Sequence, residues 1–386
     1  MKVLFASDIA FSHVPKFPGK EKVYKLMKKT AEIFKTADFS MVNLENIFGI
    51  KEKGTPILKS GPNLISDACY VEFLNALRPT VVGLANNHSG DYGEYSLFET
   101  LDILKENGYI AIGAGKDIID AYKPAILKKD GVSIAIFAVC ENEFGMADTD
   151  TAGAAGYSLS RCASAIVSAK ENGHIPVIYF HGGNEFNPIP SPKKNELYHH
   201  FIDLGAAAVI AMHTHCPQGY EYYKEKPIVY SMGNFYFPSK ELQRSDTWRY
   251  GYMTMLDIDK DSQSIELIPY HFDFDNHTPV YGEEKERFLA YIEHISKPIA
   301  DAKLLKEYFD GWCMLDRKIY NYLGHICVSE DMLKEGPPGV RRLKNIFSCE
   351  AHNELLENTI RIIFEKREKE AEKRVPEIQK LQHMEF

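Results

Sequence analysis

The chain has 386 residues, a length that predicts two domains or one large α/β domain with additions. Hydrophobic residues make up 45% and charged residues 26%, which is ordinary for a globular protein and excludes a disordered, collagenous or coiled-coil chain. The formal net charge of -9 disfavours nucleic acid as a partner, because an acidic surface repels the phosphate backbone.

The segment MKVLFASDIAF at the start of the chain enters a strand-like apolar run after one lysine. It lacks the long apolar core and the cleavage site of a secretory signal. No stretch of the sequence reaches the roughly 18 uninterrupted apolar residues of a membrane span. The seven cysteines are dispersed without CxxC pairing, which predicts reduced, buried thiols and not a disulfide framework or a zinc ribbon. We therefore expect a soluble, cytoplasmic protein without a membrane span.

Short apolar runs alternate with helical patterns along the first 230 residues. The expected strands cover 2–5, 39–43, 81–84, 110–113, 133–139, 176–181, 207–212 and 227–231, and the expected helices cover 20–34, 71–76, 95–107, 161–171 and 195–204. The strand runs are almost continuously apolar, which favours strands buried on both faces. The alternation predicts a layered α/β fold with largely parallel central strands. Between 249 and 273 the pattern becomes strands joined by turns, with a turn at 259–261.

From Glu283 onward the sequence becomes charged and amphipathic. Helices are expected at 283–295, 304–323 and 350–372, with a break at the Gly-Pro-Pro-Gly segment 336–339. We therefore place a boundary near residue 280, between an α/β domain over 1–280 and a helical region over 281–386. The apolar stripe of Ile360, Ile363 and Phe364 either caps the domain or joins a second subunit, which leaves a homo-oligomer through these helices open.

Polar residues cluster where the expected strands end. These residues are Asp8, Asn43, Glu45, Asn86, Asn87, His88, His181, Glu185, His213, His215 and Asn234. Because the carboxyl ends of strands line the ligand crevice of α/β sheets, we expect these clusters to converge.

Carboxylate, amide and imidazole donors without cysteine suit Zn, Mn, Fe or a similar divalent ion. His213 and His215 would face one direction on an extended segment, so both imidazoles could reach one site. A carboxylate such as Glu45 can bridge two cations that lie about 3.5–4 Å apart. The sequence therefore predicts one or two divalent metal ions as cofactor.

Several separated motifs carry a family resemblance. They are Ser7-Asp8, Asn43-Leu44-Glu45, Ala85-Asn86-Asn87-His88 with Asp91, Gly113-Ala114-Gly115, His181-Gly182-Gly183-Asn184-Glu185, His213-Thr214-His215 with Gln218, and Tyr230-Ser231-Met232-Gly233-Asn234. Together they resemble the bacterial capsule synthesis family that includes CapA and PgsA, which act in poly-γ-glutamate capsule biosynthesis. That family is similar in turn to the calcineurin-like metallophosphoesterases. The resemblance covers about residues 1–240, and nothing beyond residue 280 resembles a family.

The resemblance implies an α/β fold, a four-layer α/β/β/α sandwich of the metallo-dependent phosphatase type, to which this chain adds C-terminal helices. It implies metal ligation by Asp8, Glu45, Asn87, His181, His213 and His215. It makes His88 the catalytic general acid, oriented by Asp91. It also implies substrate contacts by Asn43, Glu185, Gln218 and Asn234, although Glu185 and Gln218 could instead support the ligands and Asn234 could be a turn residue.

Three positions depart from the metallophosphoesterase pattern. Ala10 stands where a histidine is usual two residues after the first aspartate, and Glu45 stands in place of a bridging aspartate. Ala211 and Met212 replace the small glycine usual before the last histidine pair. The loss of the first histidine weakens one metal position, for which His13 is a candidate substitute.

These observations predict a divalent-metal-dependent hydrolase, in which a metal-activated water attacks a phosphoester or a γ-glutamyl amide. The substrate would be a small molecule or a polyglutamate-like anion. The alternative is a non-catalytic accessory protein of capsule biosynthesis that binds poly-γ-glutamate or phosphate. Loss of the first histidine favours the binding protein, whereas Asn87-His88 and the pair His213 and His215 favour the enzyme.

Overall fold

The computed structural model describes residues 1–14, 16–239, 245–316 and 337–386. Within them the first sheet consists of eight strands, which are β1 (Lys2–Ile9), β2 (Phe39–Leu44), β5 (Val81–Gly83), β6 (Ile110–Ile112), β15 (Asn234–Tyr236), β16 (Tyr250–Ile258), β17 (Gln263–Phe272) and β18 (His277–Pro279). Strands β1, β2, β5 and β6 are parallel neighbours, and β15 pairs in parallel with β1. The antiparallel strands β16, β17 and β18 extend the sheet on the other side of β1.

The second sheet has the same plan. Among the described residues it consists of six strands, which are β8 (Ala125–Lys129), β9 (Val132–Cys140), β11 (Ile175–His181), β12 (Ala208–Met212), β13 (Tyr220–Tyr223) and β14 (Lys226–Val229). Its four central strands, β9, β11, β12 and β14, are parallel, and the edge strands β8 and β13 are antiparallel. The predicted mixed α/β fold with parallel central strands is therefore confirmed. The short strands β3 (Ile47–Phe48), β4 (Ile65–Ser66), β7 (Ala114–Gly115) and β10 (Gly153–Ala154) form two small ladders beside the sheets.

Successive side chains of β11 are buried in two different hydrophobic cores, one on each face of the second sheet, which shows how the layers stack. Val177 and Tyr179 join a core shared with β1 and the rest of the first sheet. There the Tyr179 hydroxyl donates to the carbonyl oxygen of Ala6 at 2.6 Å, and its ring stacks on Phe5. Ile178 and Phe180 point into a second core with α5 (Leu159–Glu171) and α6 (Pro192–Leu204). The second sheet therefore lies between the first sheet and this helical layer.

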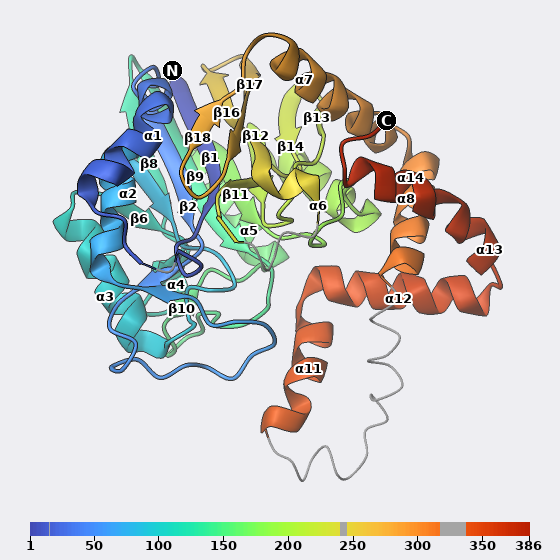
Figure 1. The fold of residues 1–386 in the computed structure, drawn as a ribbon, viewed down its shortest axis with the longest axis horizontal. Helices are drawn as coiled ribbons and strands as arrows, with labels where there is room; N and C mark the ends of the chain where they lie inside the picture. Colours follow the sequence, from blue (N-terminus) through green and yellow to red (C-terminus); the bar gives the residue numbers. More distant parts are fainter. Residues whose placement is uncertain (15, 240–244, 317–336) are drawn as a thin grey trace.

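The helices of the α/β part lie close to their predicted positions, except for the short α4, which was not predicted. They are α1 (Lys20–Phe34), α2 (Val71–Leu77), α3 (Gly93–Glu106) and the short α4 (Ile118–Ala121), in addition to α5 and α6. Figure 1 shows α1, α2 and α3 on one side of the molecule. The expected turn after residue 258 is also present, because a carboxylate oxygen of Asp259 accepts hydrogen bonds from the backbone N–H groups of Asp261 and Ser262.

The elements described after β18 are helices. They are α7 (Gly282–Ser296), α8 (Ala302–Leu315), α11 (Pro337–Ser348), α12 (Glu350–Phe364), α13 (Glu368–Ala371) and α14 (Val375–Leu381). Helices α8, α12, α13 and α14 lie together on the side of the molecule opposite α1–α3 (Figure 1). None of the helices in the described part of the chain is long and apolar enough to cross a membrane. Whether the region after residue 280 is a separate domain stays a prediction.

The structure differs from the predicted C-terminal helices in three details. The helix expected over 304–323 ends at Leu315, and 317–323 lies outside the described residues. The expected single helix over 350–372 is wrong, because α12 ends at Phe364 and Lys366 takes a left-handed φ of 57°. The expected break at 336–339 is also wrong for its described part, since α11 begins at Pro337. Proline fits the first turn of a helix, where its missing N–H has no partner to lose.

The apolar stripe of α12 does not cap the domain. Ile360, Ile363 and Phe364 are exposed, with 87% of Phe364 accessible to solvent, so contact with a second subunit stays a prediction. Of the six cysteines in the described ranges, five are buried as expected and Cys69 is exposed, while Cys327 lies outside those ranges.

Candidate metal centre

The predicted polar clusters meet where the parallel strands of both sheets end. Asp8 lies in β1 between its register partners Asn43 of β2 and Asn234 of β15. His181 ends β11, and His213 follows β12. All five side chains are buried. The convergence follows from the parallel topology, which brings the carboxyl ends of neighbouring strands to one edge.

Three residues form the centre of this cluster. Glu45, His181 and His213 each offer one ligand atom, and these atoms lie within 4.8 Å of one another. Nε2 of His181 lies 3.3 Å from Oε1 of Glu45, and the rings of His181 and His213 are 4.5 Å apart at their centroids. The three side chains could therefore hold a metal ion.

Buried polar atoms without partners support this assignment. Across the residues that the structure describes, both carboxylate oxygens of Glu45, Nε2 of His181 and Nδ1 of His213 form no hydrogen bond. Burial raises the pKa of Glu45 to about 8, because the loss of hydration outweighs the opposing charges of His215 and Lys59. Burial also lowers the pKa of His181 and holds that of His213 well below its usual range. A divalent cation bound here would give each of these buried atoms a partner, so the residues suit a metal site.

Asp8 lies at the edge of the same centre. Its Oδ1 accepts a hydrogen bond from Asn43 at 2.7 Å and lies 3.7 Å from Nε2 of His181, and its Oδ2 accepts one from the backbone N–H of His213 at 3.0 Å. Burial, followed by the nearby Glu45 carboxylate, raises the pKa of Asp8 to about 7. Asn43, predicted as a substrate contact, uses its amide to hold Asp8.

The segment of His213 and His215 is not extended, so that expectation is wrong. The φ angles of the two residues are 104° and 56°, a region that non-glycine residues occupy at an energetic cost and that is concentrated at functional sites. The two rings lie 5.9 Å apart. Nδ1 of His215 lies 2.8 Å from Oδ1 of Asn234, whose amide also donates to the carbonyl of Trp248. Asn234 thus orients His215, which leaves Nε2 as the ring atom available to a ligand.

His88 and Asp91 lie beside a buried cation that the sequence reasoning missed. Nδ1 of His88 lies 2.6 Å from Oδ2 of Asp91, while Nζ of Lys59 lies 2.6 Å from Oδ1 of Asp91 and 3.1 Å from Nδ1 of His88. Burial would raise the pKa of Asp91, but His88 and Lys59 lower it. Burial and the Lys59 ammonium lower the pKa of His88. Lys59 lies in a loop without a recognisable motif, so only the structure could find it.

Asn87 joins the centre to a second residue that was missed. Its Nδ2 donates to Oε2 of Glu143 at 3.2 Å, and its Oδ1 is buried without a hydrogen-bond partner. Oε1 of Glu143 lies 3.9 Å from Nε2 of His213. The loop that carries Asn87 and the loop that carries Glu143 contact each other at Gly90 and Gly145. A Cβ on Gly90 would lie only 2.5 Å from the Cα of Gly145, so this close contact requires glycine. Asn87 therefore has a free amide oxygen that could reach a metal ion.

The remaining predicted residues lie outside the centre. Glu185 is exposed at its rim. Gln218 is buried and donates to the carbonyl of Asn187 at 2.8 Å, so its amide stabilises the neighbouring loop. His13 belongs to neither of the groups that could hold a metal in the described ranges, and its ring lies 5.8 Å from that of Phe237.

A surface pocket of about 490 Å³ lies elsewhere on the molecule. It is lined by residues of the 3-10 helix Asp246–Arg249, of β16, β17 and α7, and by His383 and Met384. None of the residues that line it belongs to the buried centre. The buried ligand-type atoms lie instead at the strand ends.

The C-terminal helices reach the centre as well. Sγ of Cys349 lies 3.7 Å from Oε1 of Glu143 and 3.8 Å from Oε2 of Glu141. Cys349 and His352, three residues apart at the start of α12, form with Glu143 a second group whose ligand atoms lie within 4.8 Å of one another. The three-residue spacing of Cys349 and His352 in a helical pattern was the only signal for this group in the sequence, because no motif connects them to Glu143.

The fold and the site define a mixed α/β protein with a buried cluster of side chains that could hold a metal ion where its two sheets end. The family model described as bacterial capsule synthesis protein PGA_cap matches residues 2–239. The chain therefore belongs to the bacterial capsule synthesis protein family, and the predicted resemblance is confirmed.

Curated relatives carry related names. The chain is 26% identical to the capsule biosynthesis protein CapA of Bacillus anthracis, over 66% of this chain and 61% of that protein. It is 27% identical to the PGA biosynthesis protein CapA of Bacillus subtilis, over 60% of this chain and 62% of that protein. A probable polyglutamine synthesis accessory protein of Mycobacterium tuberculosis is 29% identical over 42% of this chain and 47% of that protein. The chain thus matches less than two thirds of the length of each of these relatives.

Proposed function

We propose that this protein is a divalent-metal-dependent hydrolase that acts in the biosynthesis of an anionic capsule polymer. The observation that carries the proposal is the buried group of Glu45, His181 and His213, whose ligand atoms lie within 4.8 Å of one another and lack hydrogen bonds within the described part of the chain. Leaving such atoms unpaired in a protein interior is costly. A site that loads a cation removes this cost.

Glu45, His181 and His213 would hold the ion, with Asp8, Asn87 and His215 as further ligands of a one- or two-metal centre. The donor set of carboxylate, amide oxygen and imidazole suits Mn, Zn or Fe. When bound, such an ion polarises the scissile group and lowers the pKa of water. Around this centre we propose the four-layer sandwich of the metallo-dependent phosphatase type, which is supported by the contact between Phe5 and Tyr179 across the two sheets.

The residues of the chain itself position the reaction and move its proton. His88, in its protonated form, would give the proton on Nε2 to the leaving oxygen or nitrogen, while Asp91 holds its Nδ1. Lys59 fixes that carboxylate. Asn43 and Asn234 hold Asp8 and His215 in place. Glu185, exposed at the rim, would contact the substrate.

The chemistry of the centre and the names of the relatives support one substrate class. A hydrolytic centre of this kind acts on phosphoesters and on amides alike. The relatives named for capsule biosynthesis and PGA biosynthesis support a γ-glutamyl amide of a polyglutamate-like anion, with a phosphoester as the other target.

One experiment tests the proposal with three variants of the full chain. Metal content is measured by elemental analysis after loading with Mn²⁺ or Zn²⁺, and turnover is measured on a generic phosphodiester and on a γ-glutamyl anilide. His213→Ala should lose at least one metal equivalent together with activity. His88→Ala should keep the metal and lose about 10²–10⁴-fold in turnover. His200→Ala, an exposed histidine on α6, is the matched control and should change neither.

A wild-type protein that binds no metal would end the hydrolase proposal. A His88→Ala variant that loses the metal but retains turnover per metal would contradict the role of His88.

A non-catalytic, polymer-binding accessory protein is the second candidate. Two observations favour it: Ala10 replaces the first-motif histidine, and one relative is named as a probable accessory protein. In that case metal-loaded wild-type protein would bind poly-γ-glutamate without hydrolysing it. Glu45→Gln would then abolish binding with no turnover to lose.

A further inference from the structure

The start of α12 brings two ligand-type side chains onto an acidic loop beside the proposed centre. Cys349, His352 and Glu143 each offer one ligand atom, all within 4.8 Å of one another. Cys349 and Glu143 are buried, and His352 is half-buried. Glu143 lies more than 200 positions before Cys349 and His352 in the sequence, so the group exists only in the folded chain.

The geometry points to a second divalent cation site of the zinc type, formed by Glu143, Cys349 and His352. A thiolate, an imidazole and a carboxylate are the donors that Zn²⁺ takes in proteins, and three such ligands leave the fourth tetrahedral position open. The proposed centre described above contains no sulfur ligand. The two sites therefore differ in chemistry although they are neighbours.

The surroundings of His352 resemble those of a metal-bound imidazole. Nδ1 of His352 donates to the side-chain oxygen of Asn345, which fixes the tautomer and leaves Nε2 to bind a cation. Histidine ligands commonly donate their other N–H to an oxygen acceptor in this way. Asn345 is on α11, so both C-terminal helices contribute to the group.

Glu143 contacts a lysine only through its backbone in the described part of the chain, where Nζ of Lys344 donates to its carbonyl oxygen at 3.3 Å. Among the described residues no lysine or arginine side chain forms an ion pair with its carboxylate. Its partners are Nδ2 of Asn87 at 3.2 Å, Sγ of Cys349 at 3.7 Å and Nε2 of His213 at 3.9 Å. Asn87 Oδ1, on the same amide that contacts Glu143, is buried without a partner. A cation at this position would compensate the charge of Glu143 and give the Oδ1 atom of Asn87 a partner.

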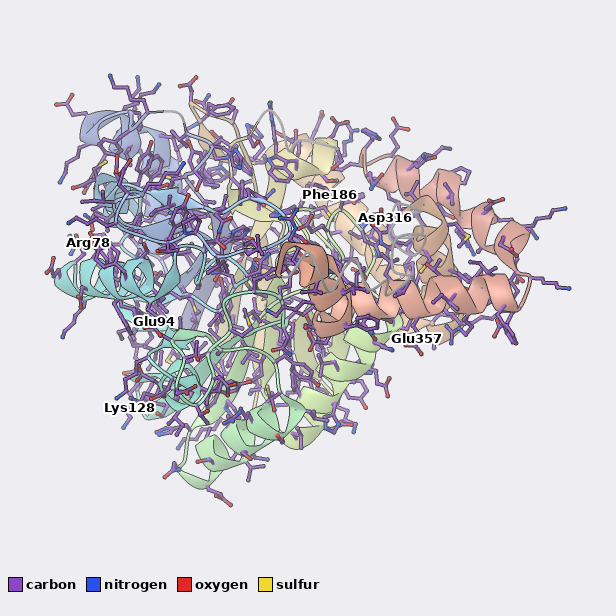
Figure 2. All side chains as sticks on the ribbon, turned by 90° about the horizontal axis from the view of Figure 1, so that it is seen from below. Arg78, Glu94, Lys128, Phe186, Asp316 and Glu357 are labelled. Carbon is purple, nitrogen blue, oxygen red and sulfur yellow. The ribbon has the colours of Figure 1, made fainter. Side chains whose placement is uncertain are left out.

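The helix that carries Cys349 and His352 is fastened to the loops at the strand ends. Both carboxylate oxygens of Glu350 accept hydrogen bonds from Asn142, one from the side chain at 2.7 Å and one from the backbone at 3.0 Å. Glu354 accepts one from the Ser191 hydroxyl at 2.6 Å. Figure 2 shows Glu357 on the same helix as it runs along the flank of the molecule. The ligands of the second site are therefore held on a fixed element, as a preorganised metal site requires.

Binding at this site exchanges a proton for the metal. The ligand is the thiolate, so the S–H proton of Cys349 leaves to solvent as the sulfur–metal bond forms. The cation then links the C-terminal helices to the loop after β9.

The test uses the full chain, stripped of metal and titrated with Co²⁺, which replaces Zn²⁺ and reports a thiolate ligand through a near-ultraviolet charge-transfer band. The wild type should develop this band, and the band should reach a plateau once the site with the thiolate ligand is filled, because Co²⁺ taken up by the proposed hydrolytic centre adds nothing to it. Cys349→Ser and His352→Gln should each lose the band or weaken Zn²⁺ binding at this site by on the order of 100-fold or more. Cys313→Ser, which removes another buried thiol, is the matched control and should keep it.

Two outcomes would overturn the proposal: a wild-type titration to saturation without a thiolate band, or a band that persists in Cys349→Ser. The near-ultraviolet circular dichroism of each variant before titration shows whether it is folded, and His352→Gln provides the test if Cys349→Ser is not. In His213→Ala the band should survive. Loss of the proposed hydrolytic centre can therefore be told apart from loss of the second site.

Discussion

Lys59 is the residue whose charge most changes the environment of the predicted catalytic pair. It is 6% exposed, and its ammonium contacts Asp91, His88 and the carbonyl oxygen of Asn87. Asp91 has two further supports, because the backbone N–H of Leu64 and Nδ1 of His88 both reach its Oδ2 at 2.6 Å. The histidine therefore sits in a network in which each polar group has a partner, and such networks fix one geometry.

Replacing Lys59 with methionine should lower the free energy of unfolding by about 3–5 kcal/mol, because it leaves the Asp91 carboxylate buried without its cation. Urea unfolding of the metal-free protein measures this. Lys35→Met is the control, since Lys35 pairs with Glu32 on the surface, and it should cost at most about 1 kcal/mol. Equal effects of the two substitutions would show that the Lys59 pair contributes no more than a surface pair.

At the scale of elements, one buried histidine ties a helix to the sheet. His277 in β18 accepts a hydrogen bond at Nδ1 from the hydroxyl of Thr30 in α1 at 2.8 Å, and its Nε2 donates to the carbonyl of Phe235 in β15 at 2.9 Å. Both ring nitrogens are used by the neutral tautomer. Burial lowers the pKa of His277 to about 3, with a small further contribution from His271.

This pKa predicts a pH dependence of stability whose sign can be worked out. Between about pH 6.5 and pH 3 the unfolded chain binds a proton at this histidine and the folded chain does not, so acid favours unfolding. The contribution of His277 to the free energy of unfolding is complete above pH 6.5 and should fall by about 1.4 kcal/mol per pH unit below pH 6.5. The free energy of unfolding measured from pH 7.5 to pH 4 tests this.

His277→Gln should be less stable than the wild type at pH 7.5, and the difference should shrink as the pH falls. His200→Gln, which changes an exposed histidine, should follow the wild-type curve. If the His277→Gln curve stays parallel to the wild-type curve, the histidine is not held neutral by the fold.

At the scale of the whole molecule, the main hydrophobic core crosses the predicted boundary near residue 280. The same cluster of buried residues contains Phe5 and Tyr179 of the two sheets, Tyr291 of α7, Trp312 of α8 and Leu355 of α12. The polar contacts of Glu350 and Glu354 with the strand-end loops add to it. From this continuity we expect the helices to unfold together with the sheets.

The full chain should therefore unfold in one cooperative calorimetric transition, with equal calorimetric and van't Hoff enthalpies. Glu354→Ala should lower the free energy of unfolding by about 1–3 kcal/mol. It leaves the Ser191 hydroxyl and the backbone N–H of Lys193 without their acceptor. Glu357→Ala, which removes an exposed pair with Lys193, is the matched control. Two separate transitions would support independent domains and the predicted boundary instead.

The sequence by itself determined the central strands and helices of the α/β part, the fold class and the strand-end residues of the candidate centre. Strand and helix patterns depend on neighbouring residues, so the predicted helix over 20–34 coincides with α1, and the runs ending near His181 and His213 are parallel neighbours. Polar residues at strand ends predicted the meeting of Asp8, Glu45, His181 and His213, because parallel strands share one edge.

Only the tertiary structure decided which residues surround that centre and what each one contacts. Lys59 lies in a loop, and Cys349 and His352 lie on a distant helix, so no local pattern could bring them to His88 or to Glu143. The backbone at His213 leaves the extended conformation, which strand periodicity could not anticipate. Burial and hydrogen bonding depend on contacts between residues far apart in the chain, and those contacts exist only once the two sheets and the C-terminal helices have packed together.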